Sequence, residues 1–164
     1  MQKSIKDMFR GKRGMDEMRE MLDHYAIEKI LKRYARALDE KNYDALDAVF
    51  TEDAVLDYTA AGGIKDRYPV VKKWLKEVLD PMPEMQHFTT NVEIEFDGDR
   101  AAGKSYTFNV NGVHAEGKLQ HMNVGAQYID TFARTPQGWR ITSRREARLV
   151  TFGYIFGPEP QAGN

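Results

Sequence analysis

The sequence has no cysteine, no long apolar run and almost no net charge. Without cysteine there is no disulfide framework and no thiol chemistry. No stretch approaches the roughly twenty apolar residues of a membrane helix, and residues 1–14 lack the apolar segment of a secretory signal. The formal net charge of -1 argues against a nucleic-acid-binding surface. We therefore expect a cytoplasmic protein that binds neither membrane nor nucleic acid.

Histidine is also scarce, and its four positions exclude a recognisable metal motif. His24, His87, His114 and His121 show no spacing typical of a helical zinc site, and no cysteine could complete one. The chain also has no phosphate-cradling glycine loop and no nucleophile elbow. Acid–base chemistry by carboxylate, imidazole and phenol groups remains, and we expect no metal.

Length and composition predict one domain with a substantial core, because the chain has 164 residues and 41% hydrophobic content. Residues 1–14 are polar and contain Gly11 and Gly14, which predicts a flexible N-terminal arm. The folded domain is expected over residues 15–156, and residues 157–164 are expected to form a mobile tail.

The periodicity of apolar residues changes along the chain from helical to strand-like. Helical spacing covers residues 18–38, 43–50 and 69–79, and alternation typical of strands covers 54–58, 92–96, 101–110, 119–134 and 139–151. Asn111-Gly112 is the strongest hairpin signal. Helices followed by strands predict an α+β domain, in which N-terminal helices cover one face of a strongly curved antiparallel sheet and enclose a cone-shaped cavity.

Asp39 ends the helix over residues 18–38, where the macrodipole disfavours a carboxylate. Either Asp39 begins a polar turn, or it acts as a base or as the orienter of His87. Strict alternation would place His87 on the solvent side with Glu93 and Glu95. A bulge within residues 89–91 would reverse this, and both possibilities remain open.

Asp130 is the only charge on the face of its strand that alternation assigns to the core. It either forms a salt bridge to an arginine of the neighbouring strand or takes part directly in the chemistry. Tyr34, Tyr58 and Tyr106 offer phenol groups at positions expected to face the core, as either structural or catalytic donors. Phe108 shares the face of Tyr106.

Four segments together resemble a known family: Arg33–Asp39, Phe50–Tyr58, His87 before the strand at 92–96, and Gly138–Ile141. The pattern resembles the SnoaL-like families of the nuclear-transport-factor-like cone fold, over nearly all of residues 16–156. Within them, Asp39 and His87 are similar to the aspartate–histidine dyad of scytalone dehydratases and hexachlorocyclohexane dehydrochlorinases. Bile-acid 7α-dehydratases are also similar, along the helix that carries Tyr34 and Asp39.

The resemblance implies a cofactor-free dehydratase or related lyase that acts on a hydrophobic cyclic substrate such as a steroid, polyketide or aromatic compound. Asp39 would orient His87, His87 would remove a proton, and a tyrosine would donate to the oxyanion or leaving group. The implied catalytic residues are Asp39, His87, Tyr34 and Tyr58, and the expected substrate-binding residues are Asp130, His114, Tyr128, Trp74 and Phe108. A homodimer or homotrimer is expected.

The same fold leaves other functions open. An isomerase or cyclase would use the same proton transfer without elimination. A non-catalytic protein would bind a ligand, or would serve assembly as small subunits of ring-hydroxylating dioxygenases do.

Overall fold

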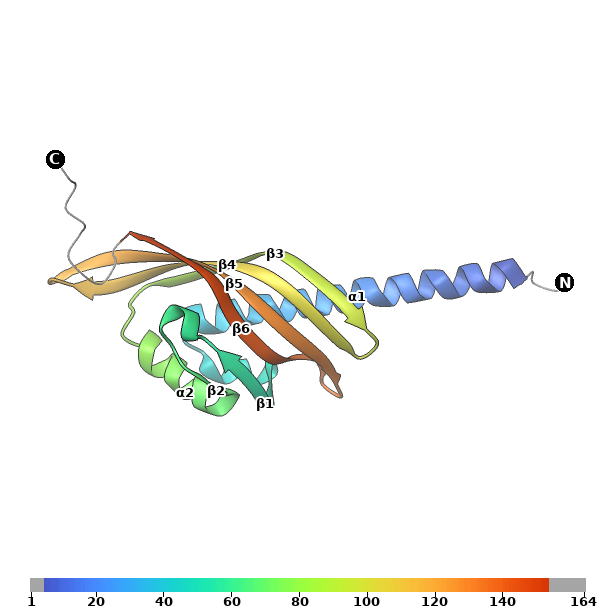
Figure 1. The fold of residues 1–164 in the computed structure, drawn as a ribbon, viewed down its shortest axis with the longest axis horizontal. Coiled ribbons are helices and arrows are strands. Elements are labelled where there is room, and N and C mark those ends of the chain that lie inside the picture. Colours follow the sequence, from blue (N-terminus) through green and yellow to red (C-terminus); the bar gives the residue numbers. More distant parts are fainter. Residues whose placement is uncertain (1–4, 154–164) are drawn as a thin grey trace.

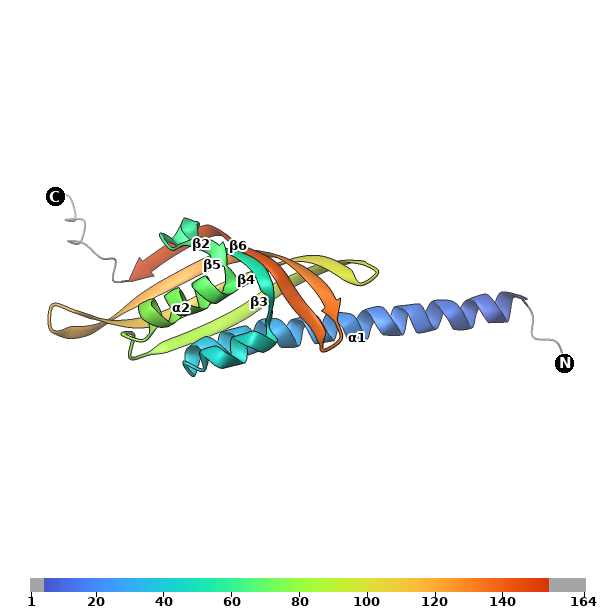
Figure 2. The same cartoon turned by 90° about the horizontal axis from the view of Figure 1, so that it is seen from below.

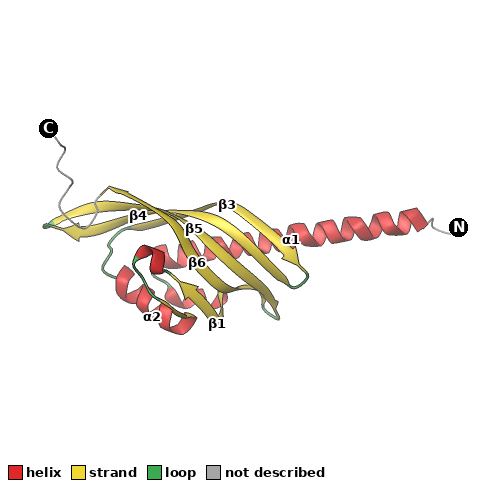
Figure 3. Cartoon of the chain, viewed as in Figure 1, coloured by secondary structure: helices red, strands yellow, loops and turns green. Residues whose placement is uncertain are grey.

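The computed structural model describes residues 5–153, in which two helices lie against one face of a curved six-stranded sheet (Figures 1 and 3). The helices are α1 (Ile5–Asp39) and α2 (Tyr68–Leu79), and two short 3-10 helices cover Tyr43–Ala48 and Thr59–Ala61. The strands are β1 (Phe50–Asp57), β2 (Lys65–Arg67), β3 (Met85–Asp97), β4 (Arg100–Ala115), β5 (Lys118–Thr135) and β6 (Gly138–Gly153). No described helix has both the length and the apolar character of a membrane span.

The strand order is β2-β1-β6-β5-β4-β3. Neighbouring strands are antiparallel except β1 and β6, which are parallel. The α+β prediction is therefore confirmed, but the sheet is mixed, whereas the sequence predicted an antiparallel one. The core lies between the helices and the concave face of the sheet. Figure 2 shows the helices and the sheet from below.

Helix α1 covers the sheet through the apolar stripe that its sequence predicts. Ile27, Ile30, Leu31, Tyr34 and Leu38 recur every three or four residues, and each is at most 5% exposed. Helix α2 has Pro69 in its first turn, where a missing N–H costs nothing. Each helix thus buries one face against the sheet.

The N-terminal segment differs from the prediction. Helix α1 begins at Ile5, so residues 5–14 of the expected arm are helical. In Figures 1 and 2 this part of α1 projects well beyond the strands. The expected tail at residues 157–164 lies outside the described residues.

The turn between β4 and β5 also differs from the prediction. It lies at Glu116 and Gly117, which both have positive φ, and not at Asn111-Gly112. Gly112 instead permits a close approach of the chain before β3: its N–H donates to Glu84 O at 2.7 Å, and a Cβ on Gly112 would lie 3.0 Å from Glu84 Cβ. Glycine is therefore required at position 112 by close packing, and the Asn111-Gly112 pair lies within β4 and forms no turn.

Two register shifts decide which residues face the helices. In β3, Thr90 pairs with Tyr106 but Glu93 pairs with Lys104, and Asn91 between them has φ of 49°. In β6, the pairing shifts between the partners of Thr131 and Phe132. Each shift exchanges the two faces of its strand for all residues beyond it.

Candidate active site

Asp39 is held at the end of α1 by the geometry of the helix terminus. Lys41 has φ of 52°, its N–H donates to Leu38 O at 3.0 Å, and Asn42 N–H donates to Ala37 O at 2.8 Å. This is the Schellman pattern, formed here without glycine. The Lys41 ammonium also donates to Asp80 O at 2.8 Å, which fixes the turn. Asp39 therefore occupies the last helical position, beside β3.

His87 faces the helices because of the bulge in β3. The bulge places His87 on the same face as Val92 and Ile94, which pack against the core, and turns Glu93 and Glu95 outward. Asp39 contacts His87 twice: Oδ1 lies 2.5 Å from the ring Nδ1, and Oδ2 accepts from the backbone N–H at 3.1 Å. The His87 side chain is 5% exposed and that of Asp39 is 24% exposed.

This double contact has a chemical consequence. A carboxylate that accepts from Nδ1–H keeps the lone pair of a neutral imidazole on Nε2, and it would stabilise the imidazolium formed on protonation. The contact to the backbone N–H holds the second carboxylate oxygen and so restricts rotation of the Asp39 side chain. A surface hollow of about 320 Å³ adjoins the pair, and it is lined by Lys32, Ala35, Arg36, Asp39, Glu40, His87 and Thr89.

Three buried tyrosines form the second part of the site. The hydroxyls of Tyr34 and Tyr58 are hydrogen-bonded at 2.9 Å, and the ring of Tyr128 meets both other rings edge to face. Burial raises the pKa of each of these phenols. Trp74 stacks on the ring of Tyr58 with ring centres 5.9 Å apart and so helps to hold that ring in place.

Arg144 of β6 lies in the middle of this cluster. Its guanidinium is 4.3 Å from the ring centre of Tyr34 and 4.0 Å from that of Tyr128. It donates twice to Asp130, from Nε at 2.8 Å and from Nη2 at 2.7 Å. Burial opposes the charge on Arg144, but Asp130 outweighs this effect and keeps the arginine pKa well above its usual value. Nη1 is buried and has no hydrogen-bond partner.

Asp130 therefore differs from the expectation that it binds substrate. Both of its oxygens are occupied by Arg144, and the residue is 3% exposed. The salt-bridge interpretation of the sequence is the one that the structure shows. Asp130 holds the guanidinium of Arg144 in place, and Nη1 of Arg144 remains without a hydrogen-bond partner.

Glu146 is a site residue that sequence reasoning missed. It is 6% exposed and lies opposite Tyr128 in the β5–β6 pairing, on the same face of β6 as Arg144. Burial raises its pKa to about 7, although the charge of Arg144 partly offsets this effect. Alternation from Trp139 and Ile141 would have turned Arg144 and Glu146 outward, and the register shift in β6 turns them inward.

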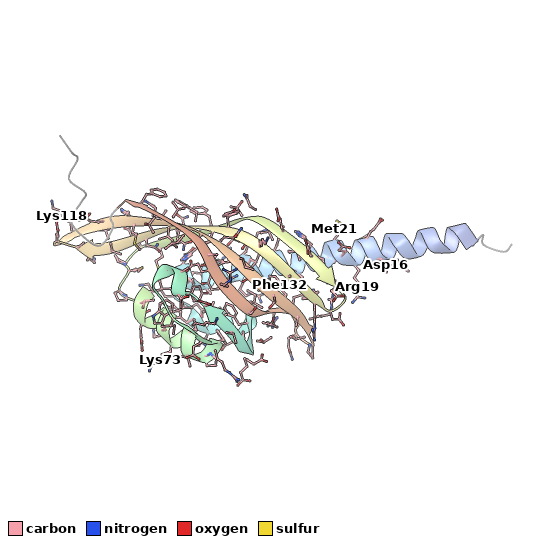
Figure 4. All side chains as sticks on the ribbon, viewed as in Figure 1. Asp16, Arg19, Met21, Lys73, Lys118 and Phe132 are labelled. Carbon is pink, nitrogen blue, oxygen red and sulfur yellow. The ribbon has the colours of Figure 1, made fainter. Side chains whose placement is uncertain are left out.

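Two expected binding residues do not reach this face. Phe108 pairs with Phe88 on the convex face, where its ring also stacks on Phe152 at 5.8 Å. His114 is exposed near the tip of the long β4–β5 hairpin, next to Lys118, which is labelled in Figure 4.

The concave face of β4 is polar, and its wall consists of Ser105, Thr107, Asn109 and Asn111. Tyr106 was expected to face the core and is instead 38% exposed on the other side. The register explains this reversal, because His87 pairs with Asn109. Among the described residues, no three acidic or histidine side chains gather as a metal ion would require.

Comparisons with known proteins agree with this architecture. A family model described as a SnoaL-like domain matches residues 19–145. The uncharacterized proteins Rv2910c of Mycobacterium tuberculosis (strain H37Rv) and Mb2934c of Mycobacterium bovis are each 41% identical over 136 residues, which is 83% of this chain and 92% of theirs.

Solved structures show the same fold at lower identity. A scytalone dehydratase-like protein from Novosphingobium aromaticivorans superposes with a TM-score of 0.73 at 23% identity, over 88% of this chain and 97% of that one. The hexachlorocyclohexane dehydrochlorinase LinA, type 2, gives a TM-score of 0.71 at 21% identity, over 88% and 99%. These likenesses establish the cone-shaped α+β fold, and the match over most of its length shows that this chain belongs to the SnoaL-like family.

Proposed function

We propose that this protein is a cofactor-free dehydratase or related lyase that removes water, or a similar leaving group, from a hydrophobic cyclic substrate. The observation that carries the proposal is the double contact of Asp39 with His87, which prepares one ring nitrogen to act as a base. The same fold in LinA and in the scytalone dehydratase-like protein agrees with elimination chemistry.

In the first step, His87 Nε2 removes a proton from the carbon next to a carbonyl or to the carbon that bears the leaving group. The electron pair of the broken C–H bond is held as an enolate where a carbonyl adjoins, and it becomes the new C=C bond only as the C–O bond breaks. Asp39 stabilises the imidazolium that results. General base catalysis of this kind accounts for roughly 10²–10⁴ in rate.

In the second step, the C–O bond breaks and the departing oxygen gains negative charge and then a proton. We propose Tyr34, Tyr58 and Nη1 of Arg144, which is buried without a hydrogen-bond partner, as the donors to this charge. Buried tyrosines with raised pKa are weak acids, whereas Glu146 has a pKa of about 7 and can release its proton near neutral pH. Glu146 would thus protonate the leaving hydroxyl as water, and the imidazolium of His87 would return a proton through solvent.

Helix α1 contributes a residue to each part of the site. Tyr34 and Asp39 are five residues apart on α1, about 7.5 Å along the helix axis. Aromatic residues Phe50, Tyr58 and Tyr128 all contact Tyr34. We propose a flat, hydrophobic, oxygenated compound such as a steroid, polyketide or phenolic ring as the substrate, because ligand sites usually combine apolar walls with few polar groups.

Glu146 also favours a second function. A buried carboxyl that can hold or release a proton could return it to a different carbon, which would make the reaction an isomerisation. Elimination and isomerisation share the step at His87 and differ in the product, since only elimination releases water.

The test is a panel of hydroxylated steroids, polyketide-type ketones and phenols, incubated with the purified chain and analysed by mass spectrometry for loss of water. Wild type should convert at least one compound, and His87→Gln should lower that rate by about 10²–10⁴. His121→Gln is the matched control, because His121 also pairs with a carboxylate, Glu84, at 2.7 Å but on the exposed surface. Compounds that bind without conversion, or full activity in His87→Gln, would sink the proposal.

A further inference from the structure

The convex face of the sheet carries an apolar patch, and both helices lie on the other side of the sheet (Figure 1). Phe88, Tyr106, Val150 and Phe152 are each between 38% and 61% exposed. The ring centre of Phe108 lies 6.4 Å from that of Phe88 and 5.8 Å from that of Phe152, so the side chains form one cluster. We call these five residues the convex patch. Single exposed apolar residues are ordinary, whereas a contiguous group marks a surface that binds another molecule.

The convex patch is arranged in rows, because directly paired residues of neighbouring strands point to the same face of a sheet. One row crosses β3, β4, β5 and β6 and consists of Phe88, Phe108, Gly125 and Val150. Gly125 interrupts this row: a Cβ built there would have only atoms of Val150 within 4 Å. The row therefore presents large rings on β3 and β4 and a position without a side chain on β5.

The charges on the same face are distributed unevenly between β3 and β6. A second row crosses the same four strands and consists of Glu93, Lys104, Ile129 and Arg145, of which the three charged residues are exposed. Glu95 adds a further carboxylate to the exposed side of β3. Among the side chains that the structure describes, neither Glu93 nor Arg145 has an ion-pair or hydrogen-bond partner. The convex face thus has an acidic side at β3 and a basic group at β6.

We propose that the convex face binds a second copy of this chain, related by a two-fold axis that runs between the two sheets, along the strands and midway between β4 and β5. This axis places β4 of each copy over β5 of the other and β3 over β6, so each row lies over the same row of the partner. Phe108 then covers the partner's Gly125, and Glu93 faces the partner's Arg145. An interface between identical copies must complement itself, and here large meets small and acidic meets basic, each contact twice. This surface is independent of the proposed active site.

The other two-fold arrangement of the same faces fits less well. An axis across the strands would place every strand over its own copy, so the acidic side of β3 would lie against the acidic side of the partner's β3. Phe108 would then lie over the partner's β4 and leave Gly125 uncovered. Facing sheets pack about 10 Å apart with their strands within about 30° of each other. Rings that meet a glycine can fill this space without crowding.

Analytical ultracentrifugation of the full chain tests the surface. Wild type should sediment as a dimer, and the double variant Val150→Glu/Phe152→Glu should weaken association about tenfold or more, because carboxylates would enter an apolar contact. Both side chains are at least half exposed, so the variant should keep the circular dichroism of the fold. Met18→Glu/Leu22→Glu is the matched control, since it places two carboxylates at exposed apolar positions of α1. A monomeric wild type, or association weakened only by the control, would refute the proposal.

Two charge variants test the orientation. Glu93→Arg and Arg145→Glu should each weaken the homodimer about tenfold or more, because like charges then face each other twice. Mixed in equal amounts, the two variants should form a heterodimer as tight as the wild-type dimer, since each charge again meets its opposite; native mass spectrometry separates it from the homodimers. Glu77→Arg, at an exposed position of α2, changes the net charge equally and should leave the dimer intact. Single variants that associate like wild type, or a mixture without heterodimer, would overturn the proposed axis.

Discussion

The buried pair of Asp130 and Arg144 makes a specific prediction about stability. Asp130 occupies two of the donors of Arg144, at 2.8 Å and 2.7 Å, and the two residues are 3% and 2% exposed. Asp130→Asn keeps the shape of the side chain but removes the negative charge. The guanidinium then stays buried among aromatic rings without a counter-charge, which costs about 3–5 kcal/mol.

Urea unfolding followed by circular dichroism measures this cost. For a chain of this size the loss corresponds to a decrease in Tm of roughly 6–20 °C. Asp99→Asn is the matched control: it breaks an ion pair with Arg134 of 2.8 Å, but Asp99 is 68% exposed, and exposed pairs contribute at most about 1 kcal/mol. The double variant Asp130→Leu/Arg144→Met should recover most of the loss, because apolar residues replace both charges. If Asp130→Asn were as stable as the control, the assignment of Arg144 as a buried cation held by Asp130 would be wrong.

Three further predictions concern single positions. Glu146 should make the protein less stable as pH rises from about 4.5 to about 7, because its carboxyl loses the proton first in the unfolded protein, while burial keeps it protonated in the folded one. Glu146→Gln should therefore increase the free energy of unfolding more at pH 8 than at pH 5 in urea titrations. An equal effect at both pH values would contradict the raised pKa. Gly112→Ala should destabilise by about 1–3 kcal/mol, because the new methyl group meets Glu84 Cβ at 3.0 Å; an unchanged unfolding midpoint would show that the chain before β3 moves aside freely. Gly14→Ala should instead stabilise α1 by roughly 0.5–1 kcal/mol, because its Cβ enters open space within a helix; the helical signal in circular dichroism should rise with it, and a lower thermal midpoint would contradict this.

Much of the fold could be predicted because its signals are local. The stripe of Ile27, Ile30 and Tyr34 predicts which face of α1 is buried, and the alternation from Ala126 to Phe132 predicts the inner face of β5. The contact of Asp39 with His87 could be anticipated only as one of two possibilities, since it depended on whether β3 contains a bulge. The sequence near Asn91 permits a bulge but does not require one.

The positions of Arg144 and Glu146 depend on how β6 pairs with β5. The periodicity of a single strand carries no information about this pairing. The shift in β6 brought Arg144 and Glu146 inward, although alternation from Trp139 turned them out. Phe108 was expected in the core because it is apolar. In the structure the concave face of β4 carries buried polar side chains, whereas Phe108 belongs to an aromatic cluster on the convex face. Hydrophobicity alone therefore could not choose the inner face of this strand.

The bulge at Asn91 has an evolutionary consequence. Every side chain from Met85 to Thr90 owes its orientation to one additional residue, so the smallest in-frame deletion in the gene would exchange the imidazole of His87 for the phenyl ring of Phe88 on the inner wall. The loss of one residue at this position would replace the contact of His87 with Asp39 by an apolar ring, while the composition of the strand hardly changed. A single codon would thus decide whether Asp39 faces an imidazole or a phenyl ring.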